Sequence, residues 1–140
     1  MGVTVMSYDP SDGLELRNTR TGKVEKKFAD GAAKFRSIIF VSPDGKYIID
    51  RTVDDNIVVW ETTGDGSPKY RIDHRSARIN AGLMGVSPDS RYLLTMTKNE
   101  ARVYGLNSGN LYRRFPIREE ATYTVTSDSR YAIMRANGWV

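Results

Sequence analysis

Cysteine is absent from this chain of 140 residues, and histidine occurs only once. The lack of cysteine excludes a disulfide framework, a zinc finger, a thiol nucleophile and a cysteine-ligated iron–sulfur cluster. The single histidine, His74, argues against a histidine-based metal site or a catalytic triad. No glycine-rich phosphate loop or calcium loop is complete either. We therefore expect a protein that is not an enzyme and that uses no cofactor.

Long apolar runs are also missing, because no uninterrupted stretch approaches the roughly 20 residues of a membrane-spanning helix. The N-terminus lacks the basic and then apolar layout of a signal peptide, so we expect a cytoplasmic protein. The 21 Lys and Arg against 17 Asp and Glu give a net charge of +4. This mild excess allows an acidic partner, such as nucleic acid or an acidic lipid, without requiring one.

A short block recurs three times along the chain. The copies are SPDGKYII from Ser42, SPDSRYLL from Ser87 and TSDSRYAI from Thr126. The first copy combines proline, aspartate and glycine, which is strong turn chemistry. Each copy therefore predicts a tight turn between two strands, and we interpret the aspartates as turn caps. These aspartates are Asp44, Asp89 and Asp128.

Apolar and β-branched runs flank the three turns and predict strands on both sides of them. The expected strands before the turns are 37–41, 83–86 and 123–125, and those after them are 47–49, 92–94 and 131–133. Further strands are expected at 3–7, at 14–17, 57–60 and 101–104, and at 23–28, 67–72 and 110–115. Six apolar positions that recur in these strands are expected to be buried between neighbouring sheets: Val41, Val86, Val125, Ile49, Leu94 and Ile133.

Four short strands in every 40 to 45 residues, without helical periodicity, predict an all-β fold built of propeller blades. The block SPDGKYII, followed by DDNIVVW and the turn at Thr63-Gly64, resembles a WD40 repeat over essentially the whole chain. The TolB-type propeller repeat is the nearest alternative. The chain has Trp60-Glu61 where WD40 repeats prefer Trp-Asp, and only Asp73-His74 is close to their Gly-His pair. The resemblance implies structural roles for Trp60 and His74.

We expect one partial β-propeller over residues 1–140. Its predicted parts are a three-stranded blade at 2–28, full blades at 35–73 and 78–117, and the first two strands of another at 121–136. About three blades cannot close a ring, because closed propellers have roughly four to eight. The chain is thus expected to be a segment of a larger propeller, completed by further blades of the same protein or by other copies.

Basic residues occupy matching positions of the strands predicted to lie outermost. These are Lys26, Lys27, Arg71, Arg113 and Arg114, with Arg75, Arg78 and Arg118 just beyond them. Such a rim either binds an acidic partner or protects an exposed edge from unwanted strand pairing. We expect a non-catalytic scaffold that binds other proteins. The alternatives are an accessory or substrate-gating propeller of an enzyme, and rim binding of acidic lipids or nucleic acid.

Overall fold

The computed structural model describes residues 4–9, 13–28, 35–52, 56–73, 85–97, 99–117 and 121–136. Within these ranges the chain forms thirteen β-strands and no helix, which confirms the all-β prediction. Nothing in the same ranges is a helix long and apolar enough to cross a membrane.

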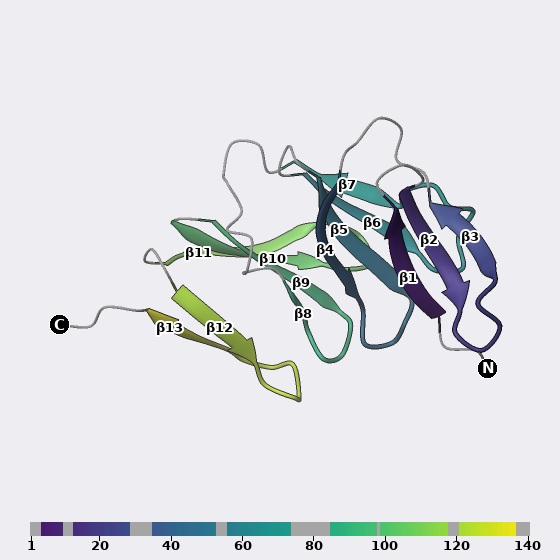
Figure 1. Cartoon of the computed structure of the whole chain (residues 1–140). Coiled ribbons are helices and arrows are strands. Elements are labelled where there is room, and N and C mark those ends of the chain that lie inside the picture. The colour runs from purple at the N-terminus through teal and green to yellow at the C-terminus, as the bar shows by residue number, and fades with distance from the viewer. Residues whose placement is uncertain are drawn as a thin grey trace.

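The strands form four open sheets, in which each strand pairs antiparallel with its neighbour in the sequence (Figure 1). The N-terminal sheet contains β1 (Thr4–Asp9), β2 (Gly13–Asn18) and β3 (Val24–Phe28). The second sheet contains β4 (Phe35–Val41), β5 (Tyr47–Thr52), β6 (Ile57–Glu61) and β7 (Tyr70–Ile72). The third sheet contains β8 (Gly85–Val86), β9 (Tyr92–Met96), β10 (Glu100–Gly105) and β11 (Leu111–Pro116). The C-terminal hairpin contains β12 (Ala121–Val125) and β13 (Ala132–Ala136).

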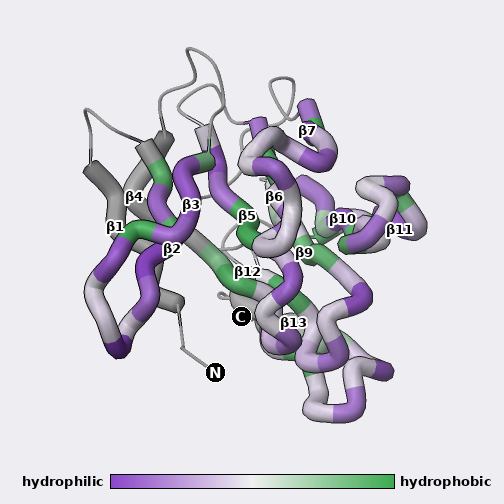
Figure 2. The backbone as a smooth tube through the Cα atoms, turned by 90° about the vertical axis from the view of Figure 1, so that its right-hand side faces the viewer, coloured by the Kyte–Doolittle hydropathy of each residue, from purple (hydrophilic) through white to green (hydrophobic). Residues whose placement is uncertain are grey.

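The second sheet lies between two others and is buried on both of its faces. All of β5 except its first residue is buried, and so is all of β6 except its last. Strand alternation directs consecutive side chains to opposite faces, so a strand buried throughout must be covered on both sides. Figure 2 shows hydrophobic stretches along β5 and β9, whereas β3 is hydrophilic.

One apolar core joins the N-terminal sheet to the second sheet. The N-terminal sheet contributes Leu14, Leu16 and Phe28, and the second sheet contributes Ile48, Val58 and Trp60. The Trp60 ring is completely buried and meets the edge of the Phe28 ring, with 6.2 Å between ring centroids. Full burial of such a side chain stabilises a fold by about 2 to 3 kcal/mol.

A second core joins the opposite face of the second sheet to the third sheet. The second sheet contributes Ile49, Ile57, Val59 and Ile72, and the third contributes Leu93, Tyr104 and Leu106. Ile48 and Ile49 are neighbours on β5, so alternation places them in different cores. The three sheets are thereby packed face to face.

The expectation that six recurring apolar positions are all buried between sheets is wrong for two of them. Ile49 and Leu94 are buried and Val86 is half-buried, whereas Val41 is 50% exposed and Ile133 57% exposed. Val41 pairs with Ile48, and so it faces the N-terminal sheet, which ends at β1 and has no further strand there in its described part. Ile133 belongs to the two-stranded hairpin, so too little sheet surrounds it to bury it. The remaining position, Val125, is half-buried.

The last strand of the second sheet is shorter than predicted. Sequence patterning indicates 67–72, but only Tyr70–Ile72 is strand. Pro68 has no backbone N–H to donate to a strand ladder. Gly66 has a φ of +94°, and a Cβ at this position would lie 2.6 Å from the Lys27 carbonyl oxygen. The turn thus fits closely against β3, which leaves only three residues for β7.

Candidate functional site

The three repeated blocks form the same turn. In the first copy, the Ser42 hydroxyl donates to Asp44 Oδ1 at 2.6 Å and accepts a hydrogen bond from the Tyr47 N–H at 2.9 Å. Asp44 Oδ1 also accepts from the Lys46 N–H at 3.0 Å. The second and third copies repeat all three hydrogen bonds, around Asp89 and Asp128. The structure thus places each of these aspartates inside its own turn.

Hydrogen bonds hold the carboxylates of these turns in their charged form. Burial acts to raise the pKa of Asp44, but hydrogen bonds with Ser42, Lys46 and Ser90 and the charge of Lys46 together lower it. The balance is the same at Asp89, where Ser87 and Arg91 are the donors. At Asp128 the hydrogen bond from Thr126 is the largest cause of the lowered pKa.

Neighbouring turns are joined by a hydrogen bond that sequence analysis missed. The Asp44 N–H donates to Ser90 Oγ at 3.0 Å, and the Asp89 N–H donates to Ser129 Oγ at 2.9 Å. Ser90 and Ser129 have φ values of 60° and 59°, at the position where the first copy has Gly45 with φ 74°. Serine in this left-handed region is strained and persists only where its surroundings hold it there. The sequence signal for this hydrogen bond was the replacement of the glycine in SPDG by serine in SPDS and TSDS.

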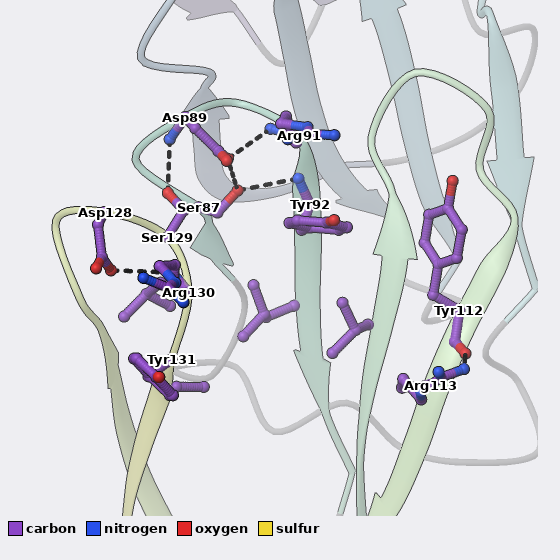
Figure 3. Close-up of a pocket in the computed structure, with 14 residues that line it drawn as sticks. Ser87, Asp89, Arg91, Tyr92, Tyr112, Arg113, Asp128, Ser129, Arg130 and Tyr131 are labelled. Atoms are coloured by element: carbon purple, nitrogen blue, oxygen red, sulfur yellow. Dashed lines mark hydrogen bonds between the residues drawn. The ribbon is translucent and has the colours of Figure 1, made fainter.

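A cavity of about 570 Å³ separates the third sheet from the C-terminal hairpin. Arg130 and Tyr131 line it from the hairpin side, while Tyr112 and Arg113 line it from β11 (Figure 3). Leu94 of β9 and Val103 of β10 pair with each other across the third sheet and form the apolar part of its wall. The cavity is therefore both apolar and rich in tyrosine and arginine.

The wall of this cavity carries an excess of positive charge. Arg91, Arg113 and Arg130 line it together with Asp89 and Asp128, and both carboxylates already accept the hydrogen bonds of their own turns. Arg91 and Arg130 lie beside the tyrosine that follows each of them, with the guanidinium carbon 5.9 Å from the ring centroid in both cases. Such contacts orient a guanidinium group without neutralising it.

Two exposed tyrosines lie on the wall of this cavity. Tyr131 is 61% exposed and Tyr112 is 54% exposed. Leu111 and Ile133 are also exposed but do not line the cavity. Ile133 follows Ala132, which does line it, so strand alternation directs the Ile133 side chain to the opposite face of the hairpin. Exposed tyrosine beside arginine is typical of binding sites for other molecules.

Two of the five residues of the predicted basic rim make contacts that are built into the fold. The Lys26 ammonium group donates to the Thr62 carbonyl at 2.8 Å and also to the Gly64 carbonyl, both in the turn between β6 and β7. Arg113 donates from Nη1 to the Tyr112 carbonyl at 2.9 Å. Lys26 pairs with Leu16 in register and Arg113 pairs with Val103, so both lie on the sheet face directed toward the C-terminal end of the stack.

The other three rim residues lie on the opposite faces of their sheets, in register with Glu15, Val58 and Arg102. Lys27 Nζ lies 3.7 Å from Glu15, and Arg114 Nη2 lies 3.2 Å from Glu100. Arg71 is exposed on β7. The basic rim residues thus lie on both faces of their sheets, and Lys27 and Arg114 lie near carboxylates.

The remaining residues singled out from the sequence are Trp60, His74 and three arginines beyond the rim. Trp60 is in the core between the N-terminal and second sheets. His74 falls outside the described residues, as do Arg75, Arg78 and Arg118. Within the described ranges, no three His, Cys, Asp or Glu side chains are grouped so as to hold a metal ion. Trp60 therefore lies apart from the cavity.

One buried carboxylate was not anticipated. Asp50 on β5 is 1% exposed, and burial raises its pKa to about 7 despite a hydrogen bond from the Arg51 N–H. It lines neither the large cavity nor an adjoining cavity of about 330 Å³ between the second and third sheets. Asp50 therefore lies apart from both cavities, and its burial bears on the stability of the fold.

Comparison with known proteins identifies the fold and no family. No protein-family model matches the chain, and no curated protein matches it in sequence. Among solved structures, the chain is similar to a crystal structure of a eukaryotic initiation factor, with a TM-score of 0.68 and 21% sequence identity. The likeness covers 92% of this chain but only 34% of that one, so the chain spans about a third of its length. At this identity the similarity concerns the fold alone.

Proposed function

We propose that the chain is a stretch of β-propeller whose repeats are of the WD40 or TolB type, and that its sheets are successive blades. The proposal is supported by two complete four-stranded antiparallel sheets stacked face to face, each with the same turn between its first two strands. The hydrogen bonds between adjacent turns also repeat from sheet to sheet. Four-stranded sheets repeated in this way are the building units of propellers.

On this scaffold, the proposed function is to bind other proteins without chemical catalysis. The observation that carries the proposal is the cavity beside the C-terminal hairpin, where Tyr112, Arg113 and Tyr131 stand around an apolar wall. Tyrosine and arginine are the side chains most enriched among residues that dominate binding energy, together with tryptophan. A rigid stack of sheets suits such a surface, since little entropy is lost when the partner docks.

Binding of acidic lipids or nucleic acid by the basic rim receives less support. Lys26 is committed to carbonyl groups of the second sheet, and Arg114 lies beside Glu100. An accessory role in an enzyme has no particular observation in its favour, and the carboxylates that line the two cavities are the turn aspartates.

The scaffold proposal is tested by affinity capture with matched variants of the whole chain. Immobilised wild type, the double variant Tyr112→Ser/Tyr131→Ser and the control Val24→Ser would be exposed to the same cell extract. We expect a discrete protein that the wild type and the control retain and that the double variant loses by at least tenfold, since each hot-spot residue contributes more than about 1 to 2 kcal/mol. Equal retention by all three variants contradicts the proposal.

A further inference from the structure

Serine is followed directly by proline at three places in this chain, and the structure distinguishes the three. Ser42 and Ser87 are 2% and 1% exposed. Each of these two hydroxyls is enclosed in its own turn, where it donates to an aspartate and accepts from a tyrosine N–H. Ser67 is exposed, in the turn between β6 and β7. Of the three serine hydroxyls that precede proline, only that of Ser67 is therefore open to another protein.

A single carboxylate holds the Ser67 hydroxyl. Asp65 Oδ1 accepts a hydrogen bond from the Ser67 N–H at 2.8 Å and another from the Ser67 hydroxyl. Asp65 is itself exposed, so a rotation of its side chain releases both groups of Ser67 without opening a core. The regular ladder of the sheet resumes at Lys69, whose N–H donates to the Val59 carbonyl at 2.7 Å. Another protein can thus grip Ser67 with little loss of native contacts.

Pro68 gives the backbone at Ser67 a defined shape. A proline ring disfavours the helical region for the residue before it and holds that residue extended, and proline itself has no N–H to donate. The strand that follows, β7, contains only three residues and lies at the edge of its sheet. Such a short edge element opens locally at low free energy. An extended serine before a proline, beside a strand that opens easily, is the kind of substrate that proline-directed protein kinases bind.

We propose that Ser67 is a phosphorylation site for a proline-directed protein kinase. The Ser67 oxygen attacks the γ-phosphorus of a nucleoside triphosphate held by the kinase, and the new O–P bond replaces the bond to the bridging oxygen of the leaving diphosphate. The hydroxyl proton passes to a carboxylate base of the kinase. The kinase supplies the triphosphate and the base, and this chain supplies the acceptor hydroxyl. The inference is independent of the proposed scaffold function, since it does not use the cavity beside the C-terminal hairpin.

A phosphate on Ser67 changes how the turn contacts the neighbouring sheet. It replaces a hydroxyl donor with a group of charge about −1.5 to −2, which repels the Asp65 carboxylate. That carboxylate is charged, because the hydrogen bonds from Ser67 and the nearby Lys26 ammonium lower its pKa. Lys26 of β3 also donates to the Thr62 and Gly64 carbonyls in the same turn, and the new anion competes with these carbonyls for it. Phosphorylation therefore loosens the contact between the β6–β7 turn and β3.

The test treats the whole chain with a mitogen-activated protein kinase and magnesium ATP, and mass spectrometry locates the phosphate. We expect one phosphate per chain, at Ser67, and loss of this label in Ser67→Ala and in Pro68→Ala. Pro68→Ala is the sharper variant, since it keeps the hydroxyl group and its Asp65 acceptor. Thr63→Ala is the control, because Thr63 is exposed in the same turn, and this variant should be labelled as the wild type is.

Synthetic peptides of residues 37–47, 62–72 and 82–92 separate the effect of sequence from that of structure. We expect the kinase to label all three peptides but only Ser67 in the folded chain, because Ser42 and Ser87 are buried there. The phosphorylated chain should unfold about 2 to 5 °C below the unmodified one, and the Lys69 N–H should exchange faster. Ser67→Ala should lower the unfolding midpoint by less, as it removes the hydroxyl group without adding charge.

Each part of the inference has a result that overturns it. Absence of phosphate at Ser67 in the folded chain, or equal labelling of Ser42 or Ser87 there, would overturn the assignment of the site. Unlabelled peptides around Ser42 and Ser87 would overturn the argument from exposure, because the sequence would then make the selection. An unchanged midpoint and unchanged exchange after phosphorylation would overturn the loosening of the turn.

Discussion

Two neighbouring regions of the molecule are aligned in the same way but filled differently. One is the interface between the second and third sheets, and the other is the space between the third sheet and the C-terminal hairpin. Both begin at a hydrogen bond between adjacent turns, from Asp44 to Ser90 and from Asp89 to Ser129. The first interface then fills with seven buried apolar residues, whereas the second opens into a cavity. Turn chemistry therefore aligns neighbouring sheets, but only a full set of strands removes their apolar faces from water.

The largest expected effect is at the other filled interface, between the N-terminal and second sheets. Trp60→Ala should destabilise the chain by about 3 to 5 kcal/mol, because the ring is fully buried against Phe28 and no neighbour can fill its volume. Val103→Ala, at the open cavity, should cost less than about 1 kcal/mol. Urea denaturation, followed by far-ultraviolet circular dichroism of the backbone, compares the free energies of unfolding of the two variants. A Val103 effect as large as that of Trp60 would mean that the cavity is closed in solution.

The buried Asp50 makes the stability of the chain depend on pH. Its folded-state pKa of about 7 lies above the ordinary 3.8, so the native state binds the proton more tightly than the unfolded state does. The stability contributed by this group is complete below about pH 4 and is lost as pH rises toward 7. The total change is at most about 4 kcal/mol, since one pKa unit is worth about 1.4 kcal/mol.

Asp50→Asn should remove this dependence and stabilise the chain at pH 8, where the wild type holds a buried charge. Denaturation midpoints measured from pH 4 to pH 8 for both proteins check the result. Asp65→Asn is a matched control, because Asp65 lies in an exposed turn and its pKa is lowered chiefly by the Ser67 hydroxyl. The same slope in wild type and Asp50→Asn would assign the pH dependence to other groups.

The hydrogen bond between turns can be tested apart from the backbone strain that accompanies it. Ser90→Ala removes the acceptor of the Asp44 N–H and keeps a side chain at φ 60°, so it should cost about 1 to 2 kcal/mol. Ser90→Gly also removes the acceptor but relieves the strain, and it should cost roughly 1 kcal/mol less. Thermal unfolding ranks the variants. Equal stability of Ala and Gly at this position would show that the left-handed conformation stores no strain.

The smallest expected effect is the difference in stability between substitutions of two adjacent lysines. Lys26→Met removes the donor to the Thr62 carbonyl and should destabilise the contact between sheets by about 1 kcal/mol. Lys27→Met, on the other face of β3, should change stability by no more than a few tenths of a kcal/mol, since Lys27 Nζ is 3.7 Å from Glu15 and its side chain is 60% exposed. Chemical denaturation in low salt provides the measurement. Identical values would indicate that both lysines act only through net charge.

Much of the local structure was predictable from the sequence because it depends on neighbours in the chain. The three turns at Ser42, Ser87 and Thr126 follow from residues within each block, and the four-strand period follows from their spacing. The candidate site was less predictable. The sequence pointed to the basic rim, but Lys26 serves the packing of two sheets and Arg113 belongs to the wall of the cavity.

The sequence by itself determined the all-β class, the turn geometry and the alternation that sends Ile48 and Ile49 to opposite faces. Only the tertiary structure decided which apolar positions are buried. Ile49 and Ile133 belong to equivalent strands, yet one is fully buried and the other 57% exposed. The physical reason is that a strand's pattern states which side chains share a face, whereas burial requires that another sheet, far away in sequence, cover that face.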